Sequence, residues 1–170
     1  MGEAKLFYVF KLVRLFMKNR VIAVFVAGFL LLFLAAPAGA RSLSSSESAL
    51  LSVINGTRSG HGLGRVSVDL RLVRVARSHS VDMLRRNYFS HGSFASRVRA
   101  SGVPGPMFGE DLAWGTAATP QWIIGQWLAS PAHRAVLLRP GFRRVGIGIV
   151  TGTFAGHGGT AVVTADFAGS

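Results

Sequence analysis

Residues 137–150, LLRPGFRRVGIGIV, are the most informative about the fold, because the spacing of apolar residues changes there from that of a helix to that of a strand. Pro140-Gly141 stops a short helix, since proline cannot continue a helix and glycine readily ends one. Beyond this stop Val145, Ile147 and Ile149 alternate with glycines, which is the two-residue period of a strand. The stretch therefore predicts a chain in which helices come mainly first and strands mainly last.

Two further segments carry strand patterns. Apolar residues alternate over 161–167, so residues 142–150 and 161–167 predict a hairpin, with residues 151–159 as its connection. Residues 107–114 predict another strand. Strands that follow helices, rather than alternating with them, indicate an α+β fold and not a parallel doubly wound sheet.

Capping residues mark the expected helices. Serine, threonine and aspartate are favoured at the cap, and proline is favoured in the first turn. The expected helices run to about residue 58 after Ser46 or Ser48, over 70–87 after Asp69, over 94–100, from Thr119-Pro120 onward, and from Ser130-Pro131 to Leu138.

The first forty residues predict export. A basic segment is followed by an apolar run over 21–36 and by Ala38-Gly39-Ala40, the pattern of a secretory signal peptide cut after Ala40. An uncleaved anchor is the alternative, since residues 21–40 match the roughly 20 residues that span a bilayer. In both cases the rest of the chain leaves the cytoplasm, secreted or held at the membrane. We expect residues 41–47 to be a short polar tether and residues 48–170 to form one domain.

Composition restricts the chemistry. The chain contains no cysteine, so it has no disulfide and no thiol nucleophile. After residue 40 it has fourteen arginines and no lysine against six acidic residues, which indicates either a cationic face for anionic lipids and polymers or a genome that favours arginine codons. Aromatic residues do not interleave with the arginines, so we expect no nucleic-acid partner.

Three short motifs contain groups that bind metals or transfer protons. They are Phe89-Ser90-His91, Gly109-Glu110-Asp111-Leu112 and Ser130-Pro131-Ala132-His133-Arg134. Two imidazoles and a carboxylate are ligands that zinc accepts, and three protein ligands leave one position open. The chain has neither a His-Glu-x-x-His helix nor a Gly-x-Ser-x-Gly elbow, so no established hydrolase motif accompanies them.

Together with the segments around them, these motifs resemble the CAP superfamily of cysteine-rich secretory proteins, antigen 5 and pathogenesis-related proteins. The resemblance extends over about residues 48–168, is strongest to short bacterial members, and implies an α-β-α sandwich with a small antiparallel sheet between helices. The matching segments, in order, are Ala76 to Met83, Phe89 to His91, Gly109 to Ala113, Trp127 to Arg134, Leu137 to Gly148, and Thr164 to Phe167.

The resemblance also implies a cavity lined by His91, Glu110 and His133. These three residues match three members of the family's tetrad of two histidines and two acids, while the fourth falls near Ser130, which is not acidic. The same three are the candidate ligands of a divalent ion such as zinc, and Glu110 is the candidate general acid or base. Asp111 replaces the usual asparagine, and is expected either to add a carboxylate to the cavity or to face outward.

For the remaining polar and aromatic residues the sequence predicts only general roles. His79 lies beside the apolar stripe of its helix and is expected to be a hydrogen-bonding packing residue, whereas His61 and His157 are expected at the surface. Asp166 is expected to brace either the sheet or a cavity histidine. The three tryptophans, Trp114, Trp122 and Trp127, are expected to pack in the core or at its rim.

Three functions are consistent with these residues. The first is an exported binding or interaction domain whose polar cavity holds a divalent ion. The second is a metal-dependent hydrolase of peptidase type, and the third is a lipid or sterol carrier. A lipid, a cell-envelope polymer or a protein is the candidate ligand, and the sequence leaves open whether the protein is an enzyme.

Overall fold

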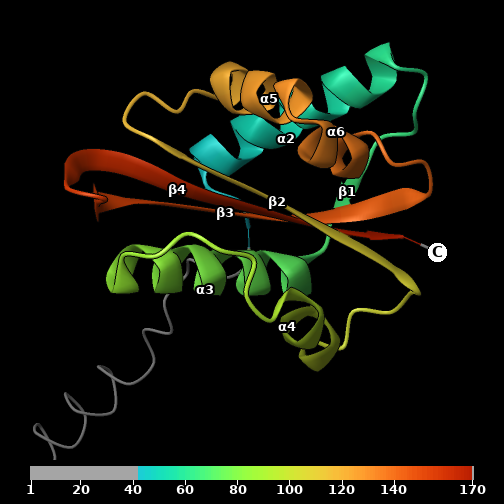
Figure 1. Cartoon of the computed structure of the whole chain (residues 1–170). Helices are drawn as coiled ribbons and strands as arrows, with labels where there is room; N and C mark the ends of the chain where they lie inside the picture. Colours follow the sequence, from blue (N-terminus) through green and yellow to red (C-terminus); the bar gives the residue numbers. More distant parts are fainter. Residues whose placement is uncertain (1–41, 170) are drawn as a thin grey trace, which may run out of the picture. The chain divides into compact units, whose positions relative to one another are not determined.

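The computed structural model describes residues 42–169, which surround a four-stranded sheet (Figure 1). The strands lie in the order β1-β3-β4-β2; β4 pairs antiparallel with both of its neighbours, β3 and β2, and the short β1 pairs parallel with β3. The strands are β1 Ser67–Val68, β2 Met107–Gly115, β3 Phe142–Phe154 and β4 His157–Gly169. The predicted α+β fold is confirmed, with a mixed sheet in place of an entirely antiparallel one.

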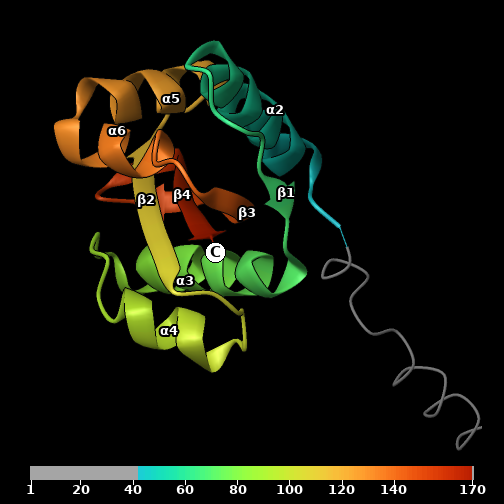
Figure 2. The same ribbon diagram turned by 90° about the vertical axis from the view of Figure 1, so that its right-hand side faces the viewer.

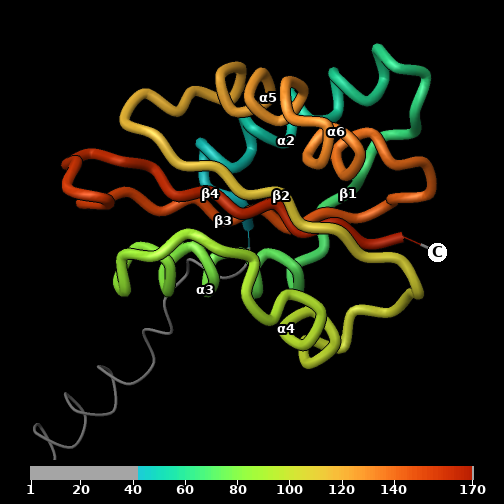
Figure 3. Tube along the Cα trace, in the orientation of Figure 1, coloured from blue at the N-terminus to red at the C-terminus, as the bar shows by residue number. Residues whose placement is uncertain are grey.

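Helices cover both faces of this sheet. Helices α2, α5 and α6 lie over one face, and α3 lies over the other with α4 beside it (Figures 1 and 2). In the tube of Figure 3, strands β2, β3 and β4 run side by side between the two layers. The helices are α2 Ser45–Gly60, α3 Leu70–Arg86, α4 Phe94–Ala100, α5 Pro120–Ala129 and α6 Pro131–Leu137. This is the expected α-β-α sandwich.

The first helix begins earlier than expected. Ser44 caps it: its hydroxyl accepts from the Glu47 amide at 3.2 Å, and the Glu47 carboxylate accepts from the Ser44 amide at 2.7 Å. This capping box needs a serine three positions before a glutamate, so Ser44 satisfies it, and the prediction of Ser46 or Ser48 was wrong. The helix therefore includes residues 45–47 of the expected tether. The predicted signal peptide or anchor, residues 1–40, lies outside the described residues.

The β3–β4 hairpin is longer than its sequence pattern indicated. Its connection is the two-residue turn Ala155-Gly156, with φ of 50° and 82°, rather than the predicted residues 151–159. Positive φ at both turn residues follows the right-handed twist of the flanking strands, which makes such a turn compatible with long paired strands. Strand β4 is central and buried along most of its length on both faces.

Two glycines of β3 allow α3 to pack directly on the sheet. A Cβ atom at Gly146 would overlap the backbone of Leu72 and Val73, and one at Gly148 would overlap the backbone of Ala76 and Arg77. The alternation of glycine with Val145, Ile147 and Ile149 thus has a structural reason. One face of β3 carries apolar side chains, and the other carries hydrogen atoms against a helix backbone.

The opposite face holds the larger apolar core. Residues of α2, α5 and α6 pack there against the inward side chains of β3 and β4, and Trp127 is its largest member. Trp127 is 1% exposed, and its indole N–H donates to the Leu112 carbonyl at 2.9 Å. None of the helices within residues 42–169 is long and apolar enough to cross a membrane.

Candidate functional site

The candidate site is formed where the segment after α3 meets the edge strand β2. Glu110 lies in the middle of β2 with its side chain 1% exposed, while His91, in the loop between α3 and α4, has a side chain 53% exposed. Nδ1 of His91 lies 2.8 Å from Oε1 of Glu110. The structure therefore brings together two of the three predicted residues as a hydrogen-bonded pair, with the carboxylate inside and the imidazole at the surface.

Arg97 of α4 completes this pair. Its guanidinium donates to Oε2 of Glu110 at 2.6 Å and to the His91 carbonyl at 2.8 Å, so one side chain holds both members. Charge-assisted hydrogen bonds of this length are among the stronger polar contacts in proteins. Sequence reasoning missed Arg97, because a lone arginine on a short helix carries no motif. Its spacing of six residues from His91 was the only available indication.

His79 of α3 holds the loop between α3 and α4 in place. It is 2% exposed, its Nε2–H donates to the Ser90 carbonyl at 3.0 Å, and Nε2 lies 3.9 Å from Oε2 of Glu110. Burial lowers the pKa of His79, more than the nearby Glu110 charge raises it, so the ring is neutral at pH 7. The expected packing role is consistent with this geometry, and the packed ring positions the residue directly before His91.

Two more carboxyl groups lie near Glu110, and both are fully buried. Asp166 of β4 is the cross-strand neighbour of Glu110, and Asp111 follows Glu110 along β2 on the opposite face of the sheet. Among the described residues neither receives a hydrogen bond on its carboxyl oxygens. Burial and then the charge of Glu110 raise the pKa of Asp166 well above its usual range, and the same two causes raise that of Asp111 to about 8. Asp111 is therefore mostly protonated at neutral pH.

Neither expectation for Asp111 describes its position. Gly109, two residues earlier on the same face, lies against Phe142 and Val136 of the α6 side, so Asp111 also faces that helical layer. It neither joins Glu110 in a cavity nor points to solvent. Asp166, by contrast, lies beside Glu110 within the sheet, where a hydrogen bond with the Glu110 carboxylate further raises its pKa.

His133 lies on α6, in the helical layer on the other face of the sheet. It lies half-buried on α6, and burial, followed by the positive charge of His91, lowers its pKa. A positive charge on His91 thus disfavours a second positive charge on His133. Within residues 42–169, however, His133 makes no hydrogen bond or ion pair with Glu110, and no group of three histidine, aspartate or glutamate side chains is arranged to hold a metal ion.

The donor set can be tested against the predicted divalent ion. Both oxygens of Glu110 already take part in a hydrogen bond, one with His91 and the other with Arg97, so a metal ion bound directly to Glu110 would have to share an oxygen with one of these partners. Because Nδ1 of His91 faces the carboxylate, Nε2 of that ring is the nitrogen left for a ligand. Glu110 thus orients the His91 ring in the way that carboxylates support zinc-bound histidines.

Comparison with known proteins identifies the family. The family model described as CAP, the cysteine-rich secretory protein family, matches residues 51–167. The chain belongs to the CAP family. This confirms the resemblance seen in the motifs, although this CAP domain contains no cysteine at all.

Bacterial relatives share this CAP domain. The uncharacterized protein YkwD of Bacillus subtilis is 32% identical over 114 residues, which are 64% of this chain and 44% of YkwD. The chain spans less than half the length of the curated relatives it matches. An extracellular protein with an SCP domain from Bacillus anthracis superposes with a TM-score of 0.64 at 27% identity, covering 74% of this chain and 40% of that one. An outer surface protein of Borrelia burgdorferi has the same fold, with a TM-score of 0.65 at 18% identity over 76% of this chain and 96% of that one.

Proposed function

We propose that this CAP domain is an exported binding module whose polar site holds a divalent metal ion between His91 and His133. The observation that carries the proposal is the hydrogen bond of 2.8 Å between Nδ1 of His91 and the buried carboxylate of Glu110. It gives a partly exposed imidazole a fixed orientation, and a fixed, partly exposed imidazole is a typical metal ligand.

The hydrogen bond also selects the tautomer of His91. A carboxylate only accepts hydrogen bonds, so the proton of the neutral ring must lie on Nδ1, and the lone pair of Nε2 is then available to a metal. The lowered pKa of His133 has a similar consequence, because it leaves this ring neutral at pH 7 and able to bind. When bound, a zinc-like ion would supply a Lewis acid to ligands that enter from solvent.

The burial of Glu110 favours binding over hydrolysis. A general base must reach the proton that it removes, directly or through one water molecule. Glu110 is 1% exposed at its side chain and is held by both Arg97 and His91, so its carboxylate is directed into the protein. A peptidase that used Glu110 as its base would have to break these hydrogen bonds, whereas a binding module keeps them intact.

Export of the protein is supported by two independent observations. The sequence of residues 1–40 has the pattern of a leader, and the structurally similar proteins include one described as extracellular and one described as an outer surface protein. We propose that the CAP domain works outside the cytoplasm of a bacterium. Proteolysis of intact cells followed by immunoblotting tests this: a protected domain would contradict it.

A zinc titration by calorimetry tests the metal site. We expect micromolar or tighter binding by the purified protein and its loss in the double variant His91→Ala/His133→Ala. Glu110→Gln, which keeps the size of the side chain, should weaken binding about 10- to 100-fold, the usual effect of losing a group that orients a ligand.

His61→Ala is the matched control. His61 is an exposed histidine at the end of α2, so this variant removes an imidazole without touching the site and should bind zinc as the wild type does. Undiminished zinc binding in the double variant would refute the proposed site.

A further inference from the structure

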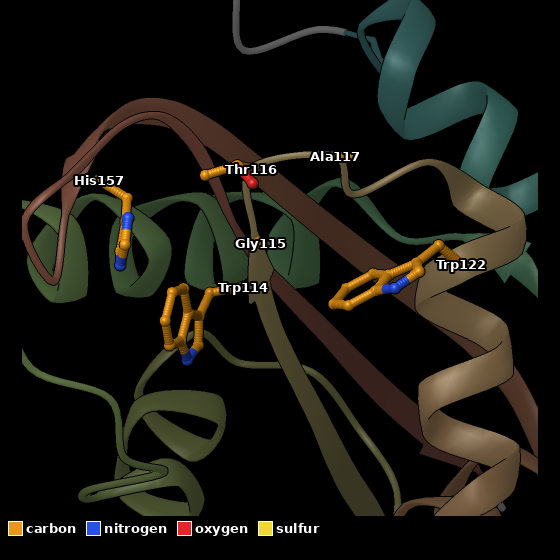
Figure 4. A pocket seen from close by; sticks show the side chains of 6 residues that line it. All are labelled: Trp114, Gly115, Thr116, Ala117, Trp122 and His157. Atoms are coloured by element: carbon orange, nitrogen blue, oxygen red, sulfur yellow. The ribbon is translucent and has the colours of Figure 1, made fainter.

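A pocket lies at the C-terminal end of β2, beyond Glu110. Its volume is about 350 Å³. Trp114 is four residues beyond Glu110 on the same strand, which places it about 13 Å away at the usual rise per residue. The lining residues are Trp114, Gly115, Thr116, Ala117, Trp122 and His157 (Figure 4).

Rigid aromatic rings form the walls of this pocket. Trp114 stacks with His157, with ring centres 6.5 Å apart and planes at 25°, and packs edge-on against Phe154 at 5.3 Å. The ring of Trp122 lies over Gly115, where an added Cβ would sit 3.1 Å from it. The neighbours thus hold both indoles in place, so a ligand that stacks on them costs little side-chain entropy.

Trp122 is also unusually accessible for its size. It is 40% exposed, and Thr116, Ala117 and His157 are exposed around it. Tryptophan is highly buried on average in folded proteins, and contiguous exposed apolar surface marks binding sites. The prediction that Trp122 packs in the core or at its rim therefore describes only part of its surroundings, since much of the ring faces solvent beside a pocket.

The lining indicates the charge of the ligand. The chain carries 19 basic and 7 acidic residues, yet neither arginine, lysine, aspartate nor glutamate is among the six residues that line the pocket. An anion would find no guanidinium there. A quaternary ammonium ion could stack on the indoles, but it would meet no carboxylate and would be repelled by the net positive charge of the protein. A neutral ligand fits best.

The openness of the pocket indicates the shape of the ligand. Acyl chains and sterols bind in sites that enclose most of their surface, whereas this pocket leaves its aromatic walls partly in water. A pyranose ring has an apolar C–H face for an indole and hydroxyl groups around its rim. Those hydroxyls would find the Thr116 side chain, the His157 ring and exposed backbone groups as hydrogen-bond partners.

We propose that this pocket binds a neutral saccharide, one or two sugar units long, by stacking on Trp114 and Trp122. This pocket is separate from the proposed metal site on His91 and His133, because no residue is shared and Trp114 lies four residues beyond Glu110 along β2. Loss of zinc binding would therefore leave saccharide binding unchanged.

NMR of the indole N–H groups tests the proposal, with chitotetraose and maltotetraose as probes. The chain has three tryptophans, so each gives its own signal. We expect at least one tetrasaccharide to shift the signals of Trp114 and Trp122 at millimolar concentration. The signal of Trp127 should stay in place because its indole is buried and donates to Leu112.

Substitutions in the pocket test whether the saccharide binds there. Trp122→Ala should weaken saccharide binding at least tenfold, and His157→Ala, at the exposed first residue of β4, should weaken it several-fold. Val81→Ala removes an apolar side chain that is 37% exposed on α3, so it serves as the control and should bind normally. An unchanged Trp127 signal verifies that each variant is folded.

Three results would overturn the proposal. The first is the absence of shifts at Trp114 and Trp122 with both tetrasaccharides. The second is a shift produced by choline or by dodecanoate but by neither sugar. The third is undiminished saccharide binding by folded Trp122→Ala and His157→Ala.

Discussion

Glu110 and Asp111 are adjacent in the sequence, yet the two faces of β2 give them opposite environments. Glu110 meets His91, Arg97 and, more distantly, His79 on the α3 side. Asp111 is completely buried on the α6 side, and no donor among residues 42–169 reaches its carboxyl oxygens. Position on the strand therefore determines what each carboxyl group does: Glu110 orients an exposed imidazole, and Asp111 is a neutral acid in an apolar layer.

The largest expected effect concerns the packing that creates the Glu110 face. Gly146→Val would force side-chain atoms into the backbone of Leu72 and Val73, where α3 touches the sheet. Such overpacking typically costs 1–3 kcal/mol, and more where backbone must move, so we expect a loss of about 3 kcal/mol or more in the free energy of unfolding. Urea denaturation followed by circular dichroism measures it.

Gly125→Ala is the matched control for this substitution. Gly125 lies inside α5 with nothing within 4 Å of an added Cβ, so alanine there should stabilise the protein by about 0.5–1 kcal/mol. If both variants unfold at the same urea concentration as the wild type, α3 does not depend on direct contact with the strand.

Glu110→Ala tests how much the buried Glu110 carboxylate contributes to stability. It leaves Arg97 and His91 without their common partner, and breaking a buried ion pair costs about 3–5 kcal/mol. Both partners retain some contact with water, with side-chain exposures of 24% and 53%, so we expect a smaller loss of about 2 kcal/mol in thermal denaturation. A loss below about 0.5 kcal/mol would mean that the network contributes nothing to stability.

Asp111→Asn tests the α6 side of β2 through the pH dependence of the free energy of unfolding. The pKa of Asp111 is raised from 3.8 to about 8 by burial, so the folded state keeps this proton while the unfolded state loses it near pH 4. Stability from this group is complete below pH 4, falls as the pH rises to about 8, and then levels off, because the unfolded state binds fewer protons in that window. The variant should therefore show a flatter decline of the free energy of unfolding between pH 5 and pH 8, measured in urea.

Asp82→Asn provides the contrasting control. A hydrogen bond from Tyr88 is the largest cause that lowers the pKa of Asp82, so its contribution is present above its unfolded pKa and is lost only as the pH falls through the acid range. This variant should keep the wild-type slope between pH 5 and pH 8. If Asp111→Asn also kept that slope, Asp111 would be ionised in the fold.

The smallest effect is expected at the surface, where charge pairs are solvated. Arg86 and Asp82 lie 3.4 Å apart with side chains 71% and 43% exposed. Exposed pairs of this kind contribute little, so Arg86→Ala should change the melting temperature by no more than a degree or two, equivalent to less than about 0.5 kcal/mol. A larger change would show that stability in this chain comes from surface charge as much as from the Glu110 network.

The fold was largely predictable from the sequence because its patterns are local. Asp69 and Thr119-Pro120 marked helix starts that the structure confirms, and the alternation around Ile147 marked β3. Strand β1 was missed because two residues carry no periodicity. The hairpin turn was placed wrongly because the strand ends, over 151–159, are polar and glycine-rich, although Ala155-Gly156 alone makes the turn.

The site was predictable only in part because its contacts are long-range. The motifs identified His91, Glu110 and His133, but no pattern indicated that Arg97 holds Glu110 or that Asp111 faces the α6 layer. Partner choice of this kind depends on the relative placement of α4, α6 and β2, which the packing of the whole domain determines. The three-ligand metal set, His91, Glu110 and His133, stays a prediction.

The most direct measurement is nitrogen NMR of the imidazole rings of His91 and His133 at pH 7, with and without zinc. We expect His91 to carry its proton on Nδ1, facing Glu110. We also expect zinc to shift the signal of Nε2 of His91 together with that of one nitrogen of His133. A proton on Nε2 of His91, or rings that zinc leaves unchanged, would contradict the claim that Glu110 prepares His91 to bind a metal ion.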